Sequence, residues 1–152
     1  MPRLTILSIF CAFILAGCTG ARPDTAPLRA GGEARGCPAK PNCVSSFAPP
    51  LTDHHVPALA VPKGETGTEA MARAVALLKA MPRSYIVKAT GDYVHAEFKS
   101  RIFRFGDDLE LLLDKKARVI HVRSASRLGY SDLGVNRARV DELRRRFTGG
   151  DS

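Results

Sequence analysis

The sequence has few of the features that mark common enzymes and nucleic-acid-binding proteins. It contains no Gly-x-Ser-x-Gly elbow and no Cys-x-x-Cys pair, so the usual serine-hydrolase turn and the usual redox-active dithiol are both missing. Aromatic residues make up 7% of the chain, and the basic stretch 137–146 contains none. Nucleic acid is therefore not expected as a partner. The net charge of +8 permits anionic partners but identifies none.

Long hydrophobic runs are also missing, apart from one at the N-terminus. The run from Leu4 to Leu15 follows a single positive charge and is too short to span a bilayer as a stable helix. It has the layout of a signal peptide, and the letters LAGC that end at Cys18 resemble a bacterial lipoprotein processing site. We expect residues 1–17 to be removed and Cys18 to be lipidated. The alternative is an ordinary signal peptide followed by a chance cysteine.

Lipidation would determine the location of the protein. Several acyl chains on one residue hold a protein durably at a membrane, because each buried CH₂ contributes about 0.8 kcal/mol. We therefore expect a palmitoylated membrane lipoprotein of the cell envelope, with its domain in the periplasm. Thr19 stands where an aspartate resembles a retention signal in some Gram-negative bacteria, which favours the outer membrane over the inner one.

Cysteine is scarce, and only one pair remains for the folded domain. Cys11 falls in the segment that should be removed and Cys18 is the expected lipid site, which leaves Cys37 and Cys43. The tight, proline-stiffened loop between them and the oxidising compartment favour a disulfide. A metal site and a redox-active pair are the alternatives. Two thiols without nearby histidines are too few metal ligands, however, and redox pairs usually have the closer Cys-x-x-Cys spacing.

The region between residues 19 and 60 differs in composition from the rest of the chain. It holds most of the ten prolines and little hydrophobic periodicity, so it buries too little apolar surface to offset the entropy of ordering. We expect residues 18–36 to be the lipidated N-terminus and a flexible spacer. Residues 37–148 should form one domain, with an extended arm at 37–60 held by the disulfide, Val44 and Phe47.

Hydrophobic spacing predicts an α+β domain. Thr66 and Glu69 form a capping box, after which apolar residues recur at helical spacing until Pro82. Four runs with a period of two and a second amphipathic helix follow. Short connections favour hairpins, so we expect a two-layer fold of order α-β-β-β-β-α, in which two helices cover one face of a four-stranded antiparallel meander sheet. The expected elements are a helix at 66–81, strands at 85–90, 93–99, 102–114 and 117–125, and a helix at 136–147.

Strand parity assigns the residues of this sheet to two faces. The apolar face, which should contact the helices, comprises Val94, Ala96, Phe98, Phe103, Phe105, Leu109, Leu111, Leu113, Ile120 and Val122. The charged face, which should be open to solvent, comprises Lys88, His95, Glu97, Lys99, Arg104, Asp108, Glu110, His121 and Arg123. The proposed hairpins place opposite charges across from each other in three pairs, which are Glu97 with Arg104, Glu110 with His121, and Asp108 with Arg123.

The charged face leads into the segment RSASRLGYSDLGVNRAR, residues 123–139. One interpretation is a polar sheet surface with paired charges. The other is a polar cleft in which Arg123, Arg127 and the free amides near Asn136 bind an anion. In the first case, Asp132 caps the last helix, Tyr130 packs, and Arg127 or Arg139 pairs with Asp107 or Asp108. The candidate binding residues are His95, Glu97, Asp107, Asp108, Glu110, Arg123, Ser126, Arg127, Tyr130, Asp132, Asn136 and Arg139.

Three stretches of the sequence resemble one family. CPAKPNCVSS, FRFGDDLEL and VRSASRLGYSDLGVNRARVDEL, in this order, are similar to the bacterial and plastid family of domain of unknown function 1499, over residues 36–146. The resemblance implies an envelope setting but no mechanism. The family pattern falls on Cys37, Pro41, Asn42, Cys43, Val44, Ser45, Asp107, Asp108, Glu110, Arg123, Ser124, Ser126, Arg127, Gly129, Tyr130, Ser131, Asp132, Gly134, Asn136 and Arg139.

Catalysis has to be judged on individual residues. Ser126 with His95 or His121 and Asp108 could form a triad, but no motif marks this serine. Asp107 and Asp108 could suggest a glycosidase, yet neighbouring strand residues point to opposite faces of a sheet.

A metal site is the remaining chemical alternative on this face. It would use the oxygen and nitrogen ligands of His95, Glu97, Asp108 and His121. Nearby Arg and Lys side chains are sufficient to neutralise the acids, so we expect neither a metal nor a cofactor.

We therefore expect a lipid-anchored envelope protein that serves as a binding or accessory module rather than as an enzyme. Its partner, besides the membrane, would be a polar or anionic small molecule, a lipid headgroup or an envelope protein. The alternative function is an envelope hydrolase that acts in the same cleft.

Overall fold

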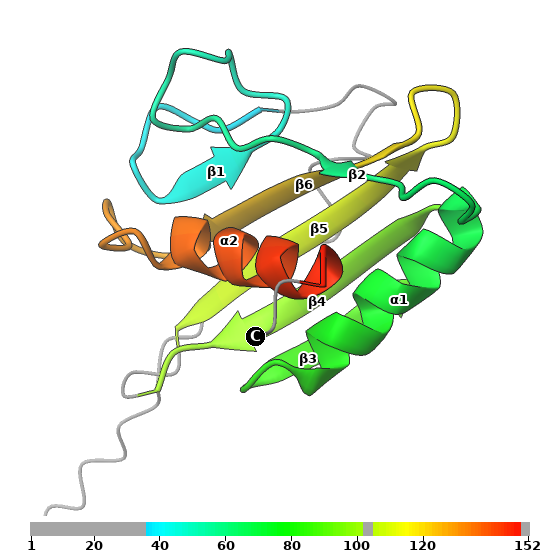
Figure 1. Ribbon diagram of the computed structural model, residues 1–152. Coiled ribbons are helices and arrows are strands. Elements are labelled where there is room, and N and C mark those ends of the chain that lie inside the picture. The colour runs from blue at the N-terminus through cyan, green and yellow to red at the C-terminus, as the bar shows by residue number, and fades with distance from the viewer. Residues whose placement is uncertain (1–35, 102–104, 150–152) are drawn as a thin grey trace, which may run out of the picture.

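The computed structural model describes residues 36–101 and 105–149. The expected signal peptide, the lipid site Cys18 and most of the spacer lie outside these residues. Neither helix of the described ranges is long and apolar enough to cross a bilayer. The elements follow one another as β1 (Cys43–Ser45), β2 (Leu59–Ala60), α1 (Gly67–Ala80), β3 (Ser84–Ala89), β4 (Tyr93–Lys99), β5 (Gly106–Asp114), β6 (Val119–Ser126) and α2 (Val135–Phe147), as Figure 1 shows.

The strands form one antiparallel sheet, which confirms the α+β class. Its order is β1-β6-β5-β4-β3, and β2 also pairs with β6. The prediction of four strands was wrong, because the N-terminal arm adds β1 and β2 to the outer edge of β6. A bare edge strand presents unpaired N–H and C=O groups, which the arm satisfies. These two strands are too short to produce a hydrophobic period in the sequence.

Helix α1 forms as its sequence indicates. The Thr66 side chain accepts a hydrogen bond from the Glu69 amide, and the Glu69 carboxylate accepts one from the Thr66 amide at 2.7 Å, so the capping box is confirmed. The helix turns its small and apolar face, including Ala70, Ala74 and Leu78, toward the sheet. Helix α2 packs in the same way through Val140, Leu143 and Phe147.

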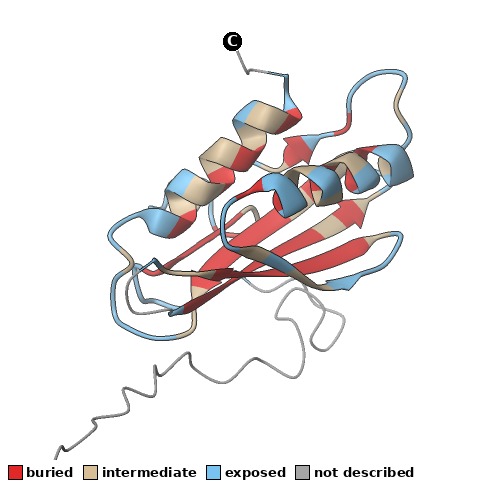
Figure 2. Cartoon of the chain, turned by 90° about the horizontal axis from the view of Figure 1, so that it is seen from below, coloured by how far each residue is buried: buried red, intermediate tan, exposed pale blue. Residues whose placement is uncertain are grey.

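Both helices cover the same face of the sheet, and the core lies between these two layers (Figure 2). The alternate residues of β4, β5 and β6 predicted for this face are buried there. Phe105 is an exception, since it lies before β5 and is 42% exposed, while Phe103 lies outside the described residues. The buried sheet residues are Val94, Ala96, Phe98, Leu109, Leu111, Leu113, Ile120 and Val122.

The hairpin connections are longer than predicted, and this changes which residues face each other. Strand β4 ends at Lys99 and β5 begins at Gly106, whereas residues 115–118 join β5 to β6. In both hairpins the observed register differs from the predicted one by an even number of residues. Each residue therefore stays on its predicted face of the sheet, while its partner on the neighbouring strand changes.

The three predicted charge pairs are therefore wrong or untested. Glu97 lies opposite Asp108, Glu110 lies opposite Arg123, and His121 lies opposite Leu112. Arg104, the partner predicted for Glu97, lies outside the described residues.

Candidate functional site

On the face of the sheet opposite the helices, six of the charged or titratable side chains form a group that we call the ionic network. They are His95, Glu97, Asp108, Glu110, Arg123 and Arg127. The prediction of an open, hydrated face was wrong for most of them, because Glu97 is 3% exposed, Glu110 0% and Arg123 8%. Buried charges are stable only when each is paired, and the network supplies these pairs.

Arg127 is the centre of the network. Its Nη2 atom lies 2.6 Å from Asp108 Oδ1 and 3.0 Å from Glu97 Oε2, and its Nε atom donates to Asp108 Oδ2 at 2.8 Å. Glu97 and Asp108 lie directly opposite each other on β4 and β5. Two carboxylates in this position repel, so the guanidinium that bridges them offsets an otherwise unfavourable register.

The titration of these groups reflects their pairing. Burial raises the pKa of the Asp108 carboxyl, but hydrogen bonds from Arg127 and His95 outweigh burial and lower this pKa to about 2. His95 Nε2 lies 2.7 Å from Asp108 Oδ1. The hydrogen bond to Asp108 raises the pKa of Arg127 in turn, against the effect of burial. Asp108 is therefore ionised at neutral pH and committed to its partners.

Glu110 forms the second part of the network. Its carboxylate accepts hydrogen bonds from the Tyr93 hydroxyl at 2.9 Å and from Arg123 Nη1 at 3.2 Å. His121, the partner predicted for Glu110, instead lies 3.1 Å from the Ser46 hydroxyl and stacks on Phe47. Burial lowers the pKa of the His121 ring, and the nearby Asp114 charge only partly offsets this. His121 is thus engaged in contacts with the arm.

A second polar cluster lies on the helix side, and we call it the polar junction. Asn136 of α2 is fully buried at its centre, and its Nδ2 donates to the Asp132 carboxylate at 2.7 Å and to the Ser126 hydroxyl at 3.0 Å. Its Oδ1 accepts from the Ser124 hydroxyl at 2.6 Å. Asn136 also donates to the backbone carbonyl of Asn42, so the junction ties the arm, β6 and α2 together.

The remaining arginines of the segment 123–139 are also engaged. Arg139 Nη2 lies 2.6 Å from Asp107 Oδ2, and its guanidinium stacks over the ring of Phe98 at 4.5 Å. Arg137 donates to the backbone carbonyls of Asp53 and His55. The predicted alternative in which Arg127 and Arg139 pair with Asp108 and Asp107 is therefore confirmed.

The N-cap residue of α2 is Gly134, and the Asp132 side chain satisfies amides at the start of this helix, as the less elaborate interpretation predicted. The Asp132 carboxylate accepts the Gly134 amide at 2.9 Å and the Asn136 amide at 2.8 Å. The alternative interpretation, an anion site made of Arg123, Arg127 and free amides near Asn136, gains no support from this geometry, because Arg123 Nη1 bonds Glu110, Arg127 bonds Asp108, and the Asn136 amide bonds Asp132.

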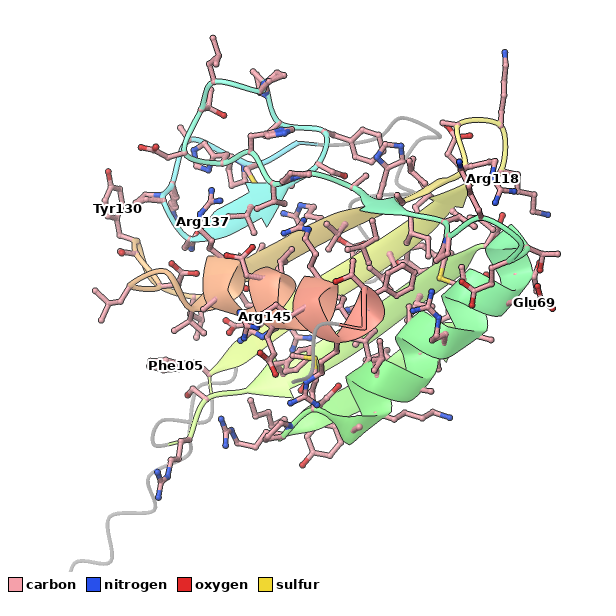
Figure 3. All side chains as sticks on the ribbon, viewed as in Figure 1. Glu69, Phe105, Arg118, Tyr130, Arg137 and Arg145 are labelled. Atoms are coloured by element: carbon pink, nitrogen blue, oxygen red, sulfur yellow. A yellow bond between two sulfur atoms is a disulfide. The ribbon has the colours of Figure 1, made fainter. Side chains whose placement is uncertain are left out.

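A cleft does lie at this end of the molecule, between the arm and the loop that precedes α2. Its volume is about 360 Å³, and Tyr130 at its rim is 71% exposed. Figure 3 shows Tyr130 directed away from the ribbon at the end of the domain where Arg137 also lies. The residues that line the cleft are Ala39, Pro41, Cys43, Val44, Asp53, His54, Tyr130, Asp132, Gly134 and Arg137.

Cys43 lines the arm side of the cleft, and its predicted disulfide with Cys37 is confirmed. His54 Nδ1 lies 2.9 Å from the carbonyl oxygen of Cys43. Asp53, His54 and Arg137 were not predicted as site residues. No motif or periodicity marks them, since only the return of the arm along β6 brings Asp53 and His54 near residues 130–137.

The candidate catalytic residues do not come together. Ser126 belongs to the polar junction on the helix side, whereas His95 and Asp108 belong to the network on the other face. Asp107 and Asp108 bond Arg139 and Arg127 on opposite faces. Within residues 36–101 and 105–149, no group of three or more His, Cys, Asp or Glu side chains has the arrangement of a metal site.

These features define a small α+β domain with a disulfide-closed arm, an internal ionic network and a polar cleft beside the loop before α2. The chain belongs to the family described as Protein of unknown function (DUF1499), whose model matches residues 34–147. No curated protein and no solved structure matches the chain. Of the three stretches that carried the resemblance, the first lies in the arm, the described part of the second lies mainly in β5, and the third runs from β6 into α2.

Proposed function

We propose that this protein is a lipid-anchored module of the bacterial cell envelope that binds a small polar or anionic ligand in the cleft beside Tyr130. The observation that carries this proposal is the meeting of two family segments around one cleft. Pro41 and Cys43 come from the arm, and Tyr130 and Gly134 come from the loop before α2. The polar groups of the junction bond one another and connect the arm, β6 and α2, whereas the cleft beside the junction has room for a ligand.

The chemistry of the cleft favours a polar ligand. The side chain of Tyr130 makes no hydrogen bond to any described residue, although its hydroxyl can donate and accept. Arg137 forms no ion pair with a described carboxylate and so contributes positive charge to the wall. His54 uses Nδ1 for the arm, and its Nε2 can serve a ligand. The lining also contains Asp53 and Asp132, and the Asp132 carboxylate is bonded to the Gly134 and Asn136 amides. A tyrosine, a histidine, an arginine and two aspartates suit a polar ligand better than an apolar molecule.

The arrangement of serine and histidine residues supports binding rather than hydrolysis. Ser46 lies 3.1 Å from His121 Nδ1, which is the distance of a nucleophile from its base. The same hydroxyl accepts the Val122 amide at 3.1 Å, and Phe47 stacks on the histidine ring. Within the described residues, no carboxylate hydrogen-bonds His121 to orient it. We infer that this pair fastens the arm to β6.

The anchor is tested by fractionation of cells that produce Cys18→Ala. We expect this variant to leave the membrane fraction and to lose incorporation of a labelled fatty acid, because the acylated thiol is gone. Cys11→Ala is the matched control, since Cys11 lies in the segment that should be removed. Membrane retention and labelling of Cys18→Ala would contradict the proposed anchor.

The cleft is tested with inorganic phosphate as the probe. The melting temperature of the full protein should rise with phosphate and saturate, relative to chloride at equal ionic strength. Arg137→Gln should abolish this rise, whereas Arg145→Gln, on the exposed side of α2, should retain it. A rise that does not saturate, or that survives in Arg137→Gln, would overturn the anion site. Labelling of Ser46 by a fluorophosphonate would instead favour the hydrolase.

A further inference from the structure

The loop between β6 and α2, together with the first residue of α2, exposes four large apolar side chains, which we call the apolar tip. They are Leu128, Tyr130, Leu133 and Val135, and their exposed fractions run from 38% for Leu128 to 94% for Leu133. A soluble domain rarely gathers apolar side chains in this way unless the surface binds something. Elsewhere in the described chain the exposed large apolar residues are Leu51, Tyr85 and Phe105.

Leu133 is the residue that the fold explains least. Its φ is 55°, in the left-handed region where a branched apolar side chain costs conformational energy and asparagine or glycine costs less. Because 94% of this side chain is exposed, no packing contact offsets that cost. Both the left-handed backbone and the exposed apolar side chain of Leu133 destabilise the protein, which indicates that this residue has a role other than stabilising the fold.

The tip is held in one shape rather than left loose. Asn42 Nδ2 donates to the Gly129 carbonyl at 3.0 Å, the Ser131 hydroxyl accepts the Leu133 amide at 3.3 Å, and the Asp132 carboxylate accepts the Gly134 amide. A loop that is already ordered loses little entropy when it binds. The apolar side chains are thus presented outward on a fixed frame.

Basic side chains border the tip. Val135 lines a cavity of about 340 Å³ together with Arg83, Lys99 and Arg101, and Arg83 and Arg101 are exposed. The two acids in the same lining are neutralised, since Asp107 pairs with Arg139 and Glu142 pairs with Arg146. Lys99 pairs with Glu97, whereas Arg83 and Arg101 form no ion pair with a described carboxylate. An apolar and aromatic tip beside two such arginines is the pattern of a surface that meets anionic lipid headgroups.

We propose that the apolar tip inserts into the interfacial region of an anionic phospholipid bilayer, with Arg83 and Arg101 at the headgroups. Leucine and valine side chains would enter the acyl boundary, while Tyr130 would lie at the headgroup level that aromatic residues prefer. This inference extends the proposed envelope function, because a tethered domain meets the bilayer at high effective concentration. It does not require the lipid on Cys18.

The chain contains no tryptophan, so one substitution creates a unique fluorescent reporter. Tyr130→Trp in the full protein, reconstituted into vesicles that contain phosphatidylglycerol with brominated acyl chains, should lose most of its emission and shift to the blue. Leu51→Trp is the matched control, because Leu51 is as exposed as Leu133 but lies in the arm. Equal quenching of the two reporters would overturn the inference even if the anchor is real.

Two further substitutions in the Tyr130→Trp background separate the apolar and electrostatic contributions. Leu133→Asn should reduce quenching several-fold while leaving the melting temperature unchanged or higher, because asparagine tolerates the left-handed conformation. Arg101→Glu should reduce quenching in phosphatidylglycerol vesicles and leave the weaker signal in phosphatidylcholine vesicles unchanged.

The outcomes distinguish this inference from the proposed cleft. Leu133 does not line the cleft, so Leu133→Asn in the otherwise unchanged protein should keep the phosphate-dependent rise in melting temperature. Full quenching in Leu133→Asn, or quenching that is the same in neutral and anionic vesicles, would overturn the tip as an anionic-lipid surface. Loss of the phosphate effect in Arg137→Gln, with quenching of the tip reporter unchanged, would support the cleft and the tip as separate sites.

Discussion

The two faces of the central sheet are built from alternate residues of the same strands, yet they are held together by different forces. On the helix side, Leu109 and Leu111 are fully buried against α1 and α2. On the other side, Asp108 and Glu110 are buried to a similar degree but bond Arg127 and Arg123. The first face depends on shape and apolar area, while the second depends on partners and on pH.

This difference has a consequence for substitution. A shortened apolar side chain leaves a cavity, whose cost is set by the volume removed. A shortened charged side chain leaves its partner buried and unpaired, which costs more than the pair itself contributes. The charged face should therefore be the more sensitive to single changes, although its pairs are not a net source of stability compared with apolar packing.

The largest effect is expected for Arg127→Ala. This change leaves Glu97 and Asp108 opposite each other without the guanidinium that bridges them, and we expect a loss of about 3–5 kcal/mol in the free energy of unfolding. Urea denaturation at pH 7 measures it. Arg145→Ala, which removes an exposed pair with Glu142, should cost less than about 1 kcal/mol. Similar losses in both variants would mean that the network is hydrated like an ordinary surface.

A somewhat smaller effect is expected for Leu111→Ala on the helix side. The side chain is fully buried in the core, so its truncation should cost about 3 kcal/mol. This loss should be the same at pH 7 and pH 3, because Leu111 packs in the apolar core and its truncation changes no charge. A loss that changes with pH would show that the two faces are coupled through the strand.

The smallest effect is the pH dependence of the charged face itself. The pKa of Asp108 is about 2 in the folded protein against an unperturbed value of 3.8. A lowered folded pKa stabilises the protein above the unperturbed value, and this contribution is lost as the pH falls from about 4 toward 2. The upper limit of this loss is between about 2 and 3 kcal/mol, and solvent screening reduces it.

Urea denaturation between pH 5 and pH 2 tests this dependence. The slope of stability against pH should become shallower in Asp108→Asn, which no longer titrates. Leu111→Ala should retain the slope of the unsubstituted protein. An unchanged slope in Asp108→Asn would assign acid sensitivity to other carboxylates.

Local sequence patterns were sufficient wherever one element determined its own structure. The capping box at Thr66 and Glu69 begins α1, the proline-rich loop favours the Cys37–Cys43 disulfide, and Asp132 satisfies amides at the start of α2. Strand parity was also reliable, because both hairpin errors shifted the register by an even number of residues. The same errors made the pairs Glu110–His121 and Asp108–Arg123 wrong, since cross-strand partners depend on the length of each connection.

Two outcomes could not be read from any single segment. The arm returns along β6 and closes the cleft with Asp53 and His54, which no local pattern connects to residues 130–137. The burial of Glu97 and Asp108 contradicts the usual exposure of acidic residues in a strand, and it depends on Arg127 reaching back across the sheet end.

By itself, the sequence determined the α+β class, the two helices, the disulfide and the division of the strands into an apolar and a charged side. These follow from backbone periodicity and capping, which act over a few neighbouring residues. Only the tertiary structure decided that the charged side is a buried network, that the arm completes the sheet, and that Leu133 stands exposed in a strained conformation. Contacts between residues far apart in the chain determine burial, and periodicity carries no information about them.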